Sequence, residues 1–394
     1  MKTSNAQEIV IVPLSQADNS DLPSRLQTPL RCFQYHPSIV SSDAIGNSIR
    51  ALDRMLRQRG IESWMVCSDE HLGQCSAGVR PLSSVVGMGW RPSDVLIVHY
   101  SFYDKNFTHI SSLPVRKVLV YHNVTPSHFF RRPGMEWIAD VTEMSLAQIA
   151  GAREVFELAV GDSKFNLSEM PDIGVTKKIA IPIFYDEISF HDCLADKDLY
   201  FNIKRSKSTN LLFVGRFVPN KRHDKLIDVL AETKRLSGRK ITLHVAGKVW
   251  NNEYYLEFLS KAASRDVLGN VRIYQDAPLA VVRTLFAAAD AFVSMSEHEG
   301  FMVPLLEAFA AGCPVVAHPT TAIGETMGDA GLKVENGLPT IAAGLIEMLS
   351  RDRQTRLDVV AGQASRALDF RGSSTFQKWL ALFRLFEAIE EVAA

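Results

Sequence analysis

The stretch Ser296-Glu-His-Glu-Gly-Phe-Met-Val-Pro-Leu-Leu-Glu-Ala-Phe-Ala-Ala-Gly312 follows a short apolar run, residues 291–295. An apolar run of this length before polar residues predicts a buried strand of a parallel sheet. Proline is favoured at the first position of a helix and glycine just past its end, so we expect a helix over residues 304–311. The order strand, loop, helix is typical of open α/β sheets, which bind ligands at the carboxyl ends of their strands.

Two glutamates frame this loop. Glu307 lies in an otherwise apolar helix, where a buried carboxylate needs a partner with hydrogen-bond donors. Glu299 precedes the helix, and the backbone N–H groups at the helix start favour an anion between the two. Those N–H groups belong to Gly300, Phe301, Met302 and Val303. A sugar nucleotide has hydroxyls on both sides of its phosphates and fits this layout. The alternative is a chance pair in which a glutamate complements the helix dipole.

A basic loop forms the second candidate. The phrase Leu211-Leu-Phe-Val-Gly-Arg-Phe-Val-Pro-Asn-Lys221 reads as a strand, a tight glycine and two cations. The planar fork of Arg216 and the mobile charge of Lys221 suit a diphosphate. The alternative is a solvated basic loop, because Arg222 and Lys225 continue the run of charge.

Both phrases resemble the family-4 retaining glycosyltransferases, which have the GT-B fold. The similar patterns are Glu-Gly-Phe-x-x-Pro-Leu-Leu-Glu-Ala-x-Ala-x-Gly-x-Pro-Val-Val and Gly-Arg-x-x-x-x-Lys. The resemblance implies that Glu307 binds the ribose diol and Glu299 the donor sugar. It also implies that Arg216 and Lys221 bind the donor diphosphate and stabilise it as the leaving group. The family usually has glycine after this lysine, whereas this chain has Arg222.

The first half of the chain offers further candidates by the same resemblance. His122 follows an apolar strand, where the family has a histidine that reaches the donor sugar. His99 ends another strand and is a weaker candidate. Gly46 and Asn47 match, in part, a small glycine-containing loop that touches the donor phosphates and the acceptor.

Other residues at strand ends are expected to surround the nucleotide base. They are Gly247, Lys248, Tyr274, Thr320, Thr321 and Glu325. Asp196 and Asp198 spell the Asp-x-Asp of metal-dependent transferases, but no apolar strand flanks them, and we interpret them as a chance match. We therefore expect no metal and no cofactor beyond the donor substrate.

The alternation of strands and helices predicts two Rossmann-like, doubly wound α/β domains. We expect the first over residues 1–185, a linker over 186–208 and the second over 209–372. In GT-B proteins the two domains face a central cleft and the last helix crosses back to the first domain. We accordingly expect residues 373–394 to pack there. A strand within residues 8–13 is an open possibility, and residues 15–28 look loop-like.

Composition bounds the function. The chain has 394 residues, 46% of them hydrophobic and 22% charged, which suffices for two cores. A net charge of −1 argues against a nucleic-acid partner. Five cysteines without metal spacing and the lack of a signal-peptide core indicate a cytoplasmic protein. Contact with the inner face of the membrane stays open, because one helix carries Arg50, Arg54, Arg57 and Arg59 on a basic face.

The sequence thus predicts a metal-independent retaining hexosyltransferase with a nucleotide-sugar donor and a glycan or lipid-linked glycan acceptor. The phrases Tyr121-His-Asn-Val-Thr-Pro126 and Val160-Gly-Asp-Ser-Lys-Phe-Asn166 look most like bacterial transferases of polysaccharide and O-antigen assembly. Many of those use GDP-mannose, which we favour over a UDP-hexose. A non-catalytic sugar-nucleotide-binding protein is the alternative from another class. A dinucleotide-dependent oxidoreductase is disfavoured because no G-x-G-x-x-G opens a helix.

Overall fold

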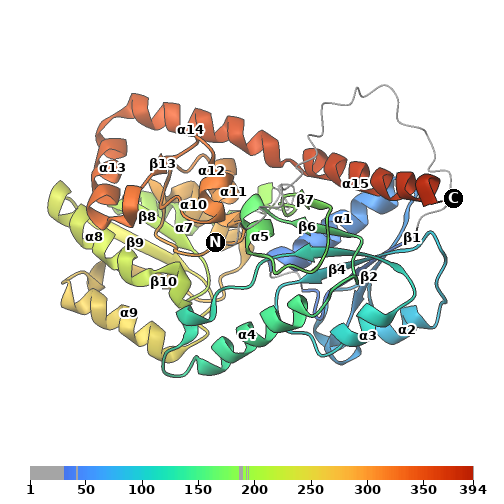
Figure 1. The fold of residues 1–394 in the computed structure, drawn as a ribbon. Helices are drawn as coiled ribbons and strands as arrows, with labels where there is room; N and C mark the ends of the chain where they lie inside the picture. Colours follow the sequence, from blue (N-terminus) through green and yellow to red (C-terminus); the bar gives the residue numbers. More distant parts are fainter. Residues whose placement is uncertain (1–30, 41–42, 186–189, 192, 194, 394) are drawn as a thin grey trace, which may run out of the picture. The chain divides into compact units, whose positions relative to one another are not determined.

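A computed structural model describes residues 31–40, 43–185, 190–191, 193 and 195–393 (Figure 1). The expected features within residues 8–13 and 15–28 lie outside this part of the chain. Two compact units form. The described residues of the first come from Met1–Val124, Met144–Phe184 and Gly372–Ala394, and those of the second from Thr125–Glu143 and Tyr185–Arg371.

The first unit is built on a parallel sheet with the strand order β3-β2-β1-β4-β5-β6-β7. Its strands are β1 (Arg31–Tyr35), β2 (Glu62–Cys67), β3 (Val79–Pro81), β4 (Val95–Tyr100), β5 (Arg116–Tyr121), β6 (Leu158–Gly161) and β7 (Lys178–Ala180). Its helices include α1 (Ala44–Gln58), α2 (Leu82–Val86), α3 (Phe107–Ser112) and α5 (Lys164–Glu169). Helix α4 (Glu136–Ala150) has residues in both units. The central strands are buried on both faces, as their unbroken apolar runs predict.

The last helix, α15 (Gly372–Ala393), completes the first unit and lies beside α1 (Figure 1). Phe376 and Trp379 pack in one apolar cluster with Leu52 and Leu56 of α1. The amphipathic pattern of the C-terminal segment therefore buries its apolar face against the first sheet's helices, and the chain's last helix returns to the unit where the described chain begins.

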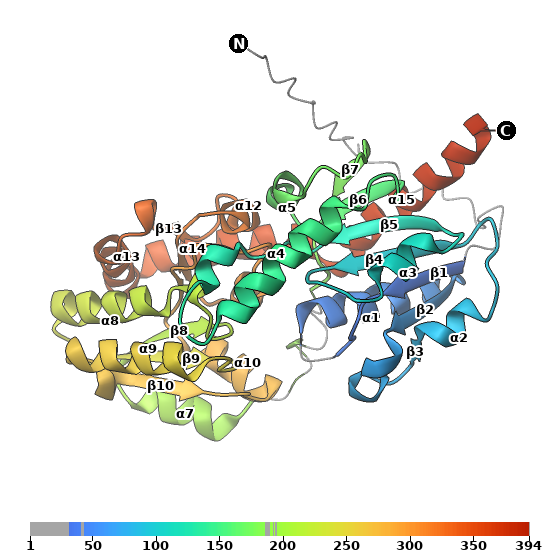
Figure 2. The same ribbon diagram turned by 60° about the horizontal axis from the view of Figure 1, so that its bottom comes forward.

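The second unit repeats the architecture with a parallel sheet of order β10-β9-β8-β11-β12-β13. Its strands are β8 (Thr209–Val214), β9 (Ile241–Ala246), β10 (Val271–Tyr274), β11 (Ala291–Ser294), β12 (Val315–Ala317) and β13 (Leu332–Lys333). Its helices include α7 (Lys197–Arg205), α8 (His223–Ser237), α9 (Asn252–Ser264), α10 (Leu279–Ala288), α11 (Val303–Ala310), α12 (Ala322–Met327), α13 (Pro339–Arg351) and α14 (Arg353–Ala367). Helices α8 and α9 lie next to each other in both views (Figures 1 and 2), and α7 packs on α10.

In each sheet, successive strands are added first on one side of the first strand and then on the other, so the strand order reverses once. In the first unit the reversal separates β1 from β4, and in the second it separates β8 from β11. Open α/β sheets bind ligands at the carboxyl ends of the strands beside such a switch point. The loop after β8 contains Arg216 and Lys221, and the loop after β11 contains Glu299, so the strongest sequence candidates lie at this place in the second unit.

The structure corrects several boundaries. The described residues of the expected linker, 186–208, include helix α7 and belong to the second unit. Asp196 caps that helix by accepting from the Leu199 N–H at 2.9 Å, and the Asp196 N–H donates to Oγ1 of Thr284 in α10 at 2.8 Å. Residues Thr125–Glu143 were expected in the first domain but pack with the second unit. Helix α11 begins at Val303 rather than Pro304. The pattern also missed β3, α13 and α14, whose short or mixed runs have weak periodicity.

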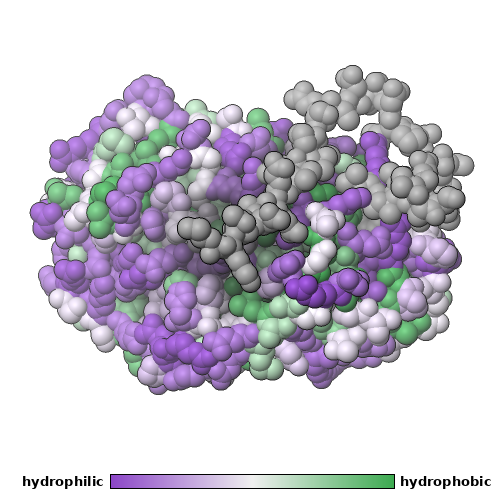
Figure 3. All heavy atoms as spheres, in the orientation of Figure 1, coloured by the Kyte–Doolittle hydropathy of each residue, from purple (hydrophilic) through white to green (hydrophobic). Residues whose placement is uncertain are grey.

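Among the described residues, no helix is long and apolar enough to cross a membrane. On the face seen in Figure 3, hydrophilic residues are interspersed with apolar ones. On α1, whose basic face was considered for membrane contact, Arg57 donates to Asp53 at 2.9 Å and the guanidinium of Arg59 lies 5.8 Å from the centre of the Phe376 ring. These two arginines therefore have partners within the first unit.

Candidate functional site

Two glycines allow the loops after β8 and β9 to lie against each other. A Cβ atom on Gly247 would come within 1.9 Å of the Gly215 carbonyl oxygen, so only glycine fits there. The Gly215 N–H donates to the Ala246 carbonyl at 2.9 Å, and the Gly247 N–H donates to the Tyr274 carbonyl at 3.0 Å. Close backbone packing thus explains Gly247, which the sequence placed among the binding residues.

The centre of the site is an ion pair between Lys221 and Glu299. The Lys221 ammonium donates to Oε2 of Glu299, and the two side chains are 15% and 8% exposed. Burial lowers the pKa of Lys221, while the Glu299 carboxylate acts in the opposite direction. The structure therefore brings together a cation and a carboxylate that lie 78 positions apart in the sequence.

Two acceptor atoms beside this pair have no hydrogen-bond partner. They are Oε1 of Glu299 and Oδ1 of Asn220, both buried. The amide of Asn220 is oriented by its N–H₂ group, which donates to the His298 carbonyl at 2.9 Å. An unmet buried acceptor costs on the order of 1–3 kcal/mol, so such atoms mark where a donor such as a ligand hydroxyl or water would bind.

Arg216 lies in the same loop as Lys221 and is exposed. Its guanidinium lies 4.5 Å from the centre of the Trp250 ring, a cation–π distance. The aromatic ring holds the plane of the guanidinium, and the guanidinium keeps its positive charge. Lys248 is also exposed, and its ammonium has no hydrogen bond or ion pair within the described part of the chain.

Glu307 occupies the polar position of an apolar helix, as expected. Among the described residues its carboxylate has no hydrogen-bond or ion-pair partner. Removal from water raises its pKa to about 7. A carboxyl group in this state gains most from a ligand that supplies hydrogen-bond donors, because these favour the ionised form.

The start of α11 is backbone-strained. Met302 has φ 73°, a left-handed conformation that is uncommon for residues other than glycine. No side chain caps the helix. Phe301 and Met302 are buried, Gly300 and Val303 are half-buried, and the Glu299 N–H donates to Oγ1 of Thr321 at 3.1 Å. The loops after β11 and β12 are therefore tied together at Glu299.

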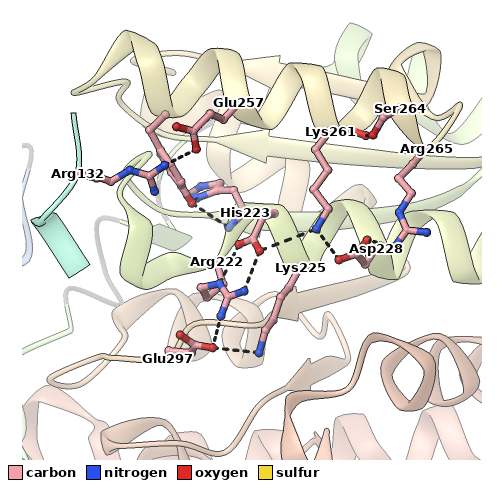
Figure 4. Close-up of polar contacts among 12 residues, drawn as sticks. Arg132, Arg222, His223, Lys225, Asp228, Glu257, Lys261, Ser264, Arg265 and Glu297 are labelled. Carbon is pink, nitrogen blue, oxygen red and sulfur yellow. Dashed lines mark hydrogen bonds and ion pairs between the residues drawn. The ribbon is translucent and has the colours of Figure 1, made fainter. Parts of the chain in front are cut away.

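Arg222, which replaces the family's usual glycine, acts within the protein. It donates to Asp224 at 2.8 Å and to Glu297, and Lys225 reaches the same Glu297 at 3.0 Å (Figure 4). The carboxylates raise the pKa of Arg222. Its φ of 51° shows that the backbone is in the region that glycine prefers. Arg222 therefore fastens the loop of Lys221 to the loop of Glu299.

The Tyr274 side chain is held by residues of its own sheet. Its hydroxyl forms a hydrogen bond with Nδ1 of His244 at 3.0 Å, and Nε2 of His244 bonds Oδ1 of Asn210 at 3.1 Å. The tyrosine side chain is therefore engaged with its own sheet. Of the other strand-end candidates, Thr320 and Glu325 are half-buried, and the Glu325 main-chain carbonyl accepts from Arg366 at 2.8 Å.

In the first unit, His122 is buried and bonded through both ring nitrogens. Its Nδ1 lies 2.8 Å from Oδ2 of Asp162, and its Nε2 lies 2.9 Å from Nδ1 of His99. Burial lowers the pKa of His99 well below its usual value, so His99 is neutral at pH 7. The Nδ1–H of His122 donates to the Asp162 carboxylate, and the direction of the bond between His122 and His99 depends on the tautomers of the two rings. Nε2 of His99 is left buried without a partner.

The loop before α1 also differs from expectation. The Gly46 N–H donates to the Asp43 carboxylate at 2.6 Å, and the Asn47 N–H donates to the Asp43 carbonyl at 3.1 Å. A Cβ on Gly46 would lie 2.0 Å from the Val40 carbonyl oxygen. Asp43 thus caps α1 with the two N–H groups, and only the half-buried Asn47 side chain is available for a ligand.

Residues Thr125–Glu143 join the second unit through mixed contacts. Phe130 packs with Val218 of the basic loop, and the ring of Phe129 lies 6.1 Å from that of His298. Arg132 pairs with Glu257 (Figure 4). This aromatic and basic segment therefore lies beside the Lys221–Glu299 loops.

Sequence reasoning missed Asn220 and Asp162. The Asn220 amide lies one position before the predicted Lys221, and Asp162 follows β6 at the level where His122 follows β5. Asp162 could have been found, because carboxyl ends of neighbouring parallel strands share one edge. Asp196 is a helix cap, and within the described residues no group of side chains is arranged to hold a metal ion.

Comparison with known proteins identifies a matching family model and several similar proteins. Residues 196–365 match the model of the glycosyl transferases group 1 family. The O-antigen chain mannosyltransferase B of Escherichia coli is 27% identical over 192 residues, which is 48% of this chain and 49% of that protein. The D-inositol 3-phosphate glycosyltransferase of Frankia alni is 32% identical over 181 residues, 44% of each chain.

Solved structures match over nearly the whole chain. HepE of Anabaena, crystallised with UDP and glucose, has a TM-score of 0.69 at 16% identity and is matched over 90% of this chain and 99% of its own. Sucrose-phosphate synthase of Thermosynechococcus elongatus also has a TM-score of 0.69, at 15% identity, with 91% and 100% covered. At these identities the likeness concerns the fold.

The protein therefore has the GT-B fold, with two Rossmann-like units on parallel sheets. Residues 196–365 are similar to the group 1 glycosyltransferases. The alignments span about half the length of the curated relatives, and they cover less than half of this chain.

Proposed function

We propose that the protein is a retaining glycosyltransferase that moves a hexose from a nucleotide diphosphosugar to a hydroxyl of a growing glycan. The observation that carries this is the Lys221–Glu299 pair at the switch point of the second sheet. It offers a cation for a diphosphate and, in Oε1 of Glu299, an unmet acceptor for a sugar hydroxyl. The match to the group 1 family supports the same chemistry.

The proposed roles follow the family resemblance, and the position of each side chain is compatible with them. Arg216 and Lys221 stabilise the negative charge that forms on the diphosphate as its bond to the anomeric carbon breaks. The acceptor oxygen bonds to that carbon, and the acceptor's proton leaves with the diphosphate or to solvent. Glu307 accepts hydrogen bonds from the ribose hydroxyls, and the backbone N–H groups of residues 300–303 lie next to the phosphates. Retention of configuration rests on the family resemblance.

For the donor, we favour GDP-mannose over a UDP-hexose. The support is the E. coli relative, an O-antigen chain mannosyltransferase, at 27% identity. We further propose that the acceptor is a glycan of polysaccharide assembly, that the transfer needs no metal ion, and that the enzyme works in the cytoplasm at the inner membrane surface. The exposed Arg54 on α1 supports the contact with anionic lipid.

The test is thermal unfolding against a panel of nucleotide sugars and their diphosphates. A true donor at one hundred times its Kd raises the free energy of unfolding by about 2.7 kcal/mol. GDP-mannose should give the largest shift, and transfer to a glycan acceptor should follow. Stabilisation without turnover on any acceptor would favour a non-catalytic sugar-nucleotide-binding protein, and no stabilisation by any nucleotide sugar would reject both.

A further inference from the structure

A cavity lies in the second unit at the amino ends of β8 and β11. It has a volume of about 530 Å³ and is bounded by the end of α7, the first residues of β8 and β11, and helices α13 and α14. Ligand sites for small molecules have volumes of roughly 300–1,000 Å³. The loops that carry Lys221 and Glu299 follow the opposite ends of the same strands, so this cavity is separate from the candidate donor site.

The cavity wall is strongly basic. It contains four cations and one carboxylate, Asp290. The cations are Lys204, Lys207, Arg239 and Arg356. Apolar side chains, among them Ile346 and Leu349, complete the wall. A concave surface of this mixed kind suits a molecule with an anionic group and a less polar body.

Two of the four cations, Lys207 and Arg356, have no carboxylate partner within the described part of the chain. The single carboxylate, Asp290, accepts from the Asn210 N–H at 2.8 Å and lies 3.9 Å from the Lys204 ammonium. Arg356 donates to the main-chain carbonyl of Asp290 at 2.7 Å, a neutral acceptor. Lys207 has no side-chain partner within the described part of the chain. Arg239 pairs with Glu347 at 2.5 Å.

Helix dipoles account for the cation at Lys204 but not for those at Lys207 and Arg356. Helices α7 and α13 end at the cavity, and a helix C-terminus carries about half a negative charge, which Lys204 complements. Lys207 lies beyond the end of α7, in a left-handed conformation with φ 52°. Arg356 lies in the first turn of α14, where the dipole disfavours a cation. The helix dipoles therefore do not account for the cations at these two positions, which lie at the cavity wall without a carboxylate partner among the described residues.

We propose that this cavity binds a small phosphorylated molecule. A phosphate group carries up to two negative charges and several acceptor oxygens, which Lys204, Lys207 and Arg356 can share. The body of the ligand packs on Ile346 and Leu349. Because binding there does not require Glu299 or Glu307, the inference stands apart from the proposed transfer reaction.

The experiment separates the two sites with variants of each. In the background Arg216→Ala/Lys221→Ala, which weakens any diphosphate binding at the candidate donor site, inorganic diphosphate is titrated by calorimetry at low and at physiological salt. We expect binding to persist in this background and to weaken with salt. Adding Lys204→Glu/Lys207→Glu should weaken it at least tenfold. Both lysines are exposed, but Lys204→Glu places a carboxylate near Asp290 and at the C-terminus of α7, so the unfolding temperature without ligand checks that the fold is kept.

The matched control is Lys177→Glu, an exposed lysine of the first unit, which should change the affinity less than twofold. Diphosphate binding that is equal in the Lys204→Glu/Lys207→Glu variant and its background would overturn the proposal. The absence of any diphosphate binding in the background would overturn it as well. If the background binds diphosphate but no nucleotide sugar binds the unaltered protein, the cavity is supported and the proposed function fails.

Discussion

The carboxyl edges of the two sheets carry opposite kinds of chemistry on the same topology. In the first unit, Asp162, His122 and His99 form a buried chain whose hydrogen bonds are made inside the unit. In the second, Lys221 pairs with Glu299 while an oxygen of Glu299 and the Glu307 carboxylate lack partners. Within the described residues the first edge also leaves one atom, Nε2 of His99, without a partner. The second edge leaves carboxylate oxygens unpaired beside cations and is therefore prepared for a ligand, whereas the Asp162–His122–His99 bonds of the first edge are made by the fold.

The largest effect should come from the cations of the second edge. Lys221→Ala removes charge that stabilises the leaving diphosphate and leaves Glu299 unpaired, so we expect turnover to fall by on the order of 10²–10³. Arg216→Ala should fall in the same range without disturbing Glu299. Steady-state rates at saturating donor measure this, with Lys177→Glu as the control. Near-normal turnover in both single variants would show that the second edge is not the catalytic one.

The two glutamates should separate by ligand. Glu307→Gln should weaken binding of the free nucleotide diphosphate and of the whole donor alike, by roughly ten- to hundredfold. Glu299→Gln should leave the free diphosphate nearly unchanged while it lowers transfer and the choice between sugars. Calorimetric titration with the diphosphate and an unreactive donor analogue compares them. Equal loss of diphosphate affinity in both variants would contradict the division of roles.

The pKa of Glu307 predicts a dependence of stability on pH. Its native value is about 7, raised from the usual 4.5 by removal from water. This carboxyl group therefore contributes stability that is fully present below pH 4.5 and lost as the pH rises through 7. The Glu307→Gln variant has no carboxyl group at this position and avoids that loss of stability. Without ligand, its free energy of unfolding should exceed that of the unaltered protein by up to about 3 kcal/mol at pH 8 and should not exceed it at pH 4.5.

Urea unfolding of both proteins between pH 4.5 and 8.5 checks this, with Glu325→Gln, a half-buried glutamate of the same unit, as the comparison. A difference between Glu307→Gln and the unaltered protein that does not grow with pH would mean that the Glu307 carboxyl is not desolvated.

A smaller effect is expected at the first edge. Asp162→Asn keeps the size of the side chain but weakens the hold on His122, so we expect turnover to drop by about tenfold, within the range of a lost orienting hydrogen bond, with diphosphate affinity unchanged. Nitrogen chemical shifts of the imidazoles should show the His122 Nδ1–H tautomer before the substitution and a mixture after it. A loss of diphosphate binding in this variant would show that the two edges are not independent.

The smallest expected effect is none. Because two cations, Arg216 and Lys221, are available for the diphosphate, we predict that transfer persists in excess EDTA. Activity that disappears with the chelator and returns with Mg²⁺ or Mn²⁺ would contradict this and would require another account of how the diphosphate charge is balanced.

Much of this molecule followed from its sequence. Unbroken apolar runs identified the central strands of both sheets, because a strand buried on both faces tolerates few polar residues. Proline and glycine located α11 to within one residue, because they act through the local backbone. The family-like spacing of Arg216, Lys221, Glu299 and Glu307 selected residues that lie at strand ends in the second unit. The edge strand β3 and the late helices α13 and α14 escaped, because their patterns are short or mixed.

Tertiary structure alone decided the partners. Nothing in the sequence joins Lys221 to Glu299, 78 positions away, or encloses His122 between His99 and Asp162. The sequence also could not show that residues 125–143 join the second unit, or that Gly46 and Asn47 give their N–H groups to Asp43. Residue type and spacing determine what a side chain can do. Whether the hydrogen bonds of that side chain are already satisfied depends on which distant loops lie beside it. The strand order of the folded chain decides which loops these are.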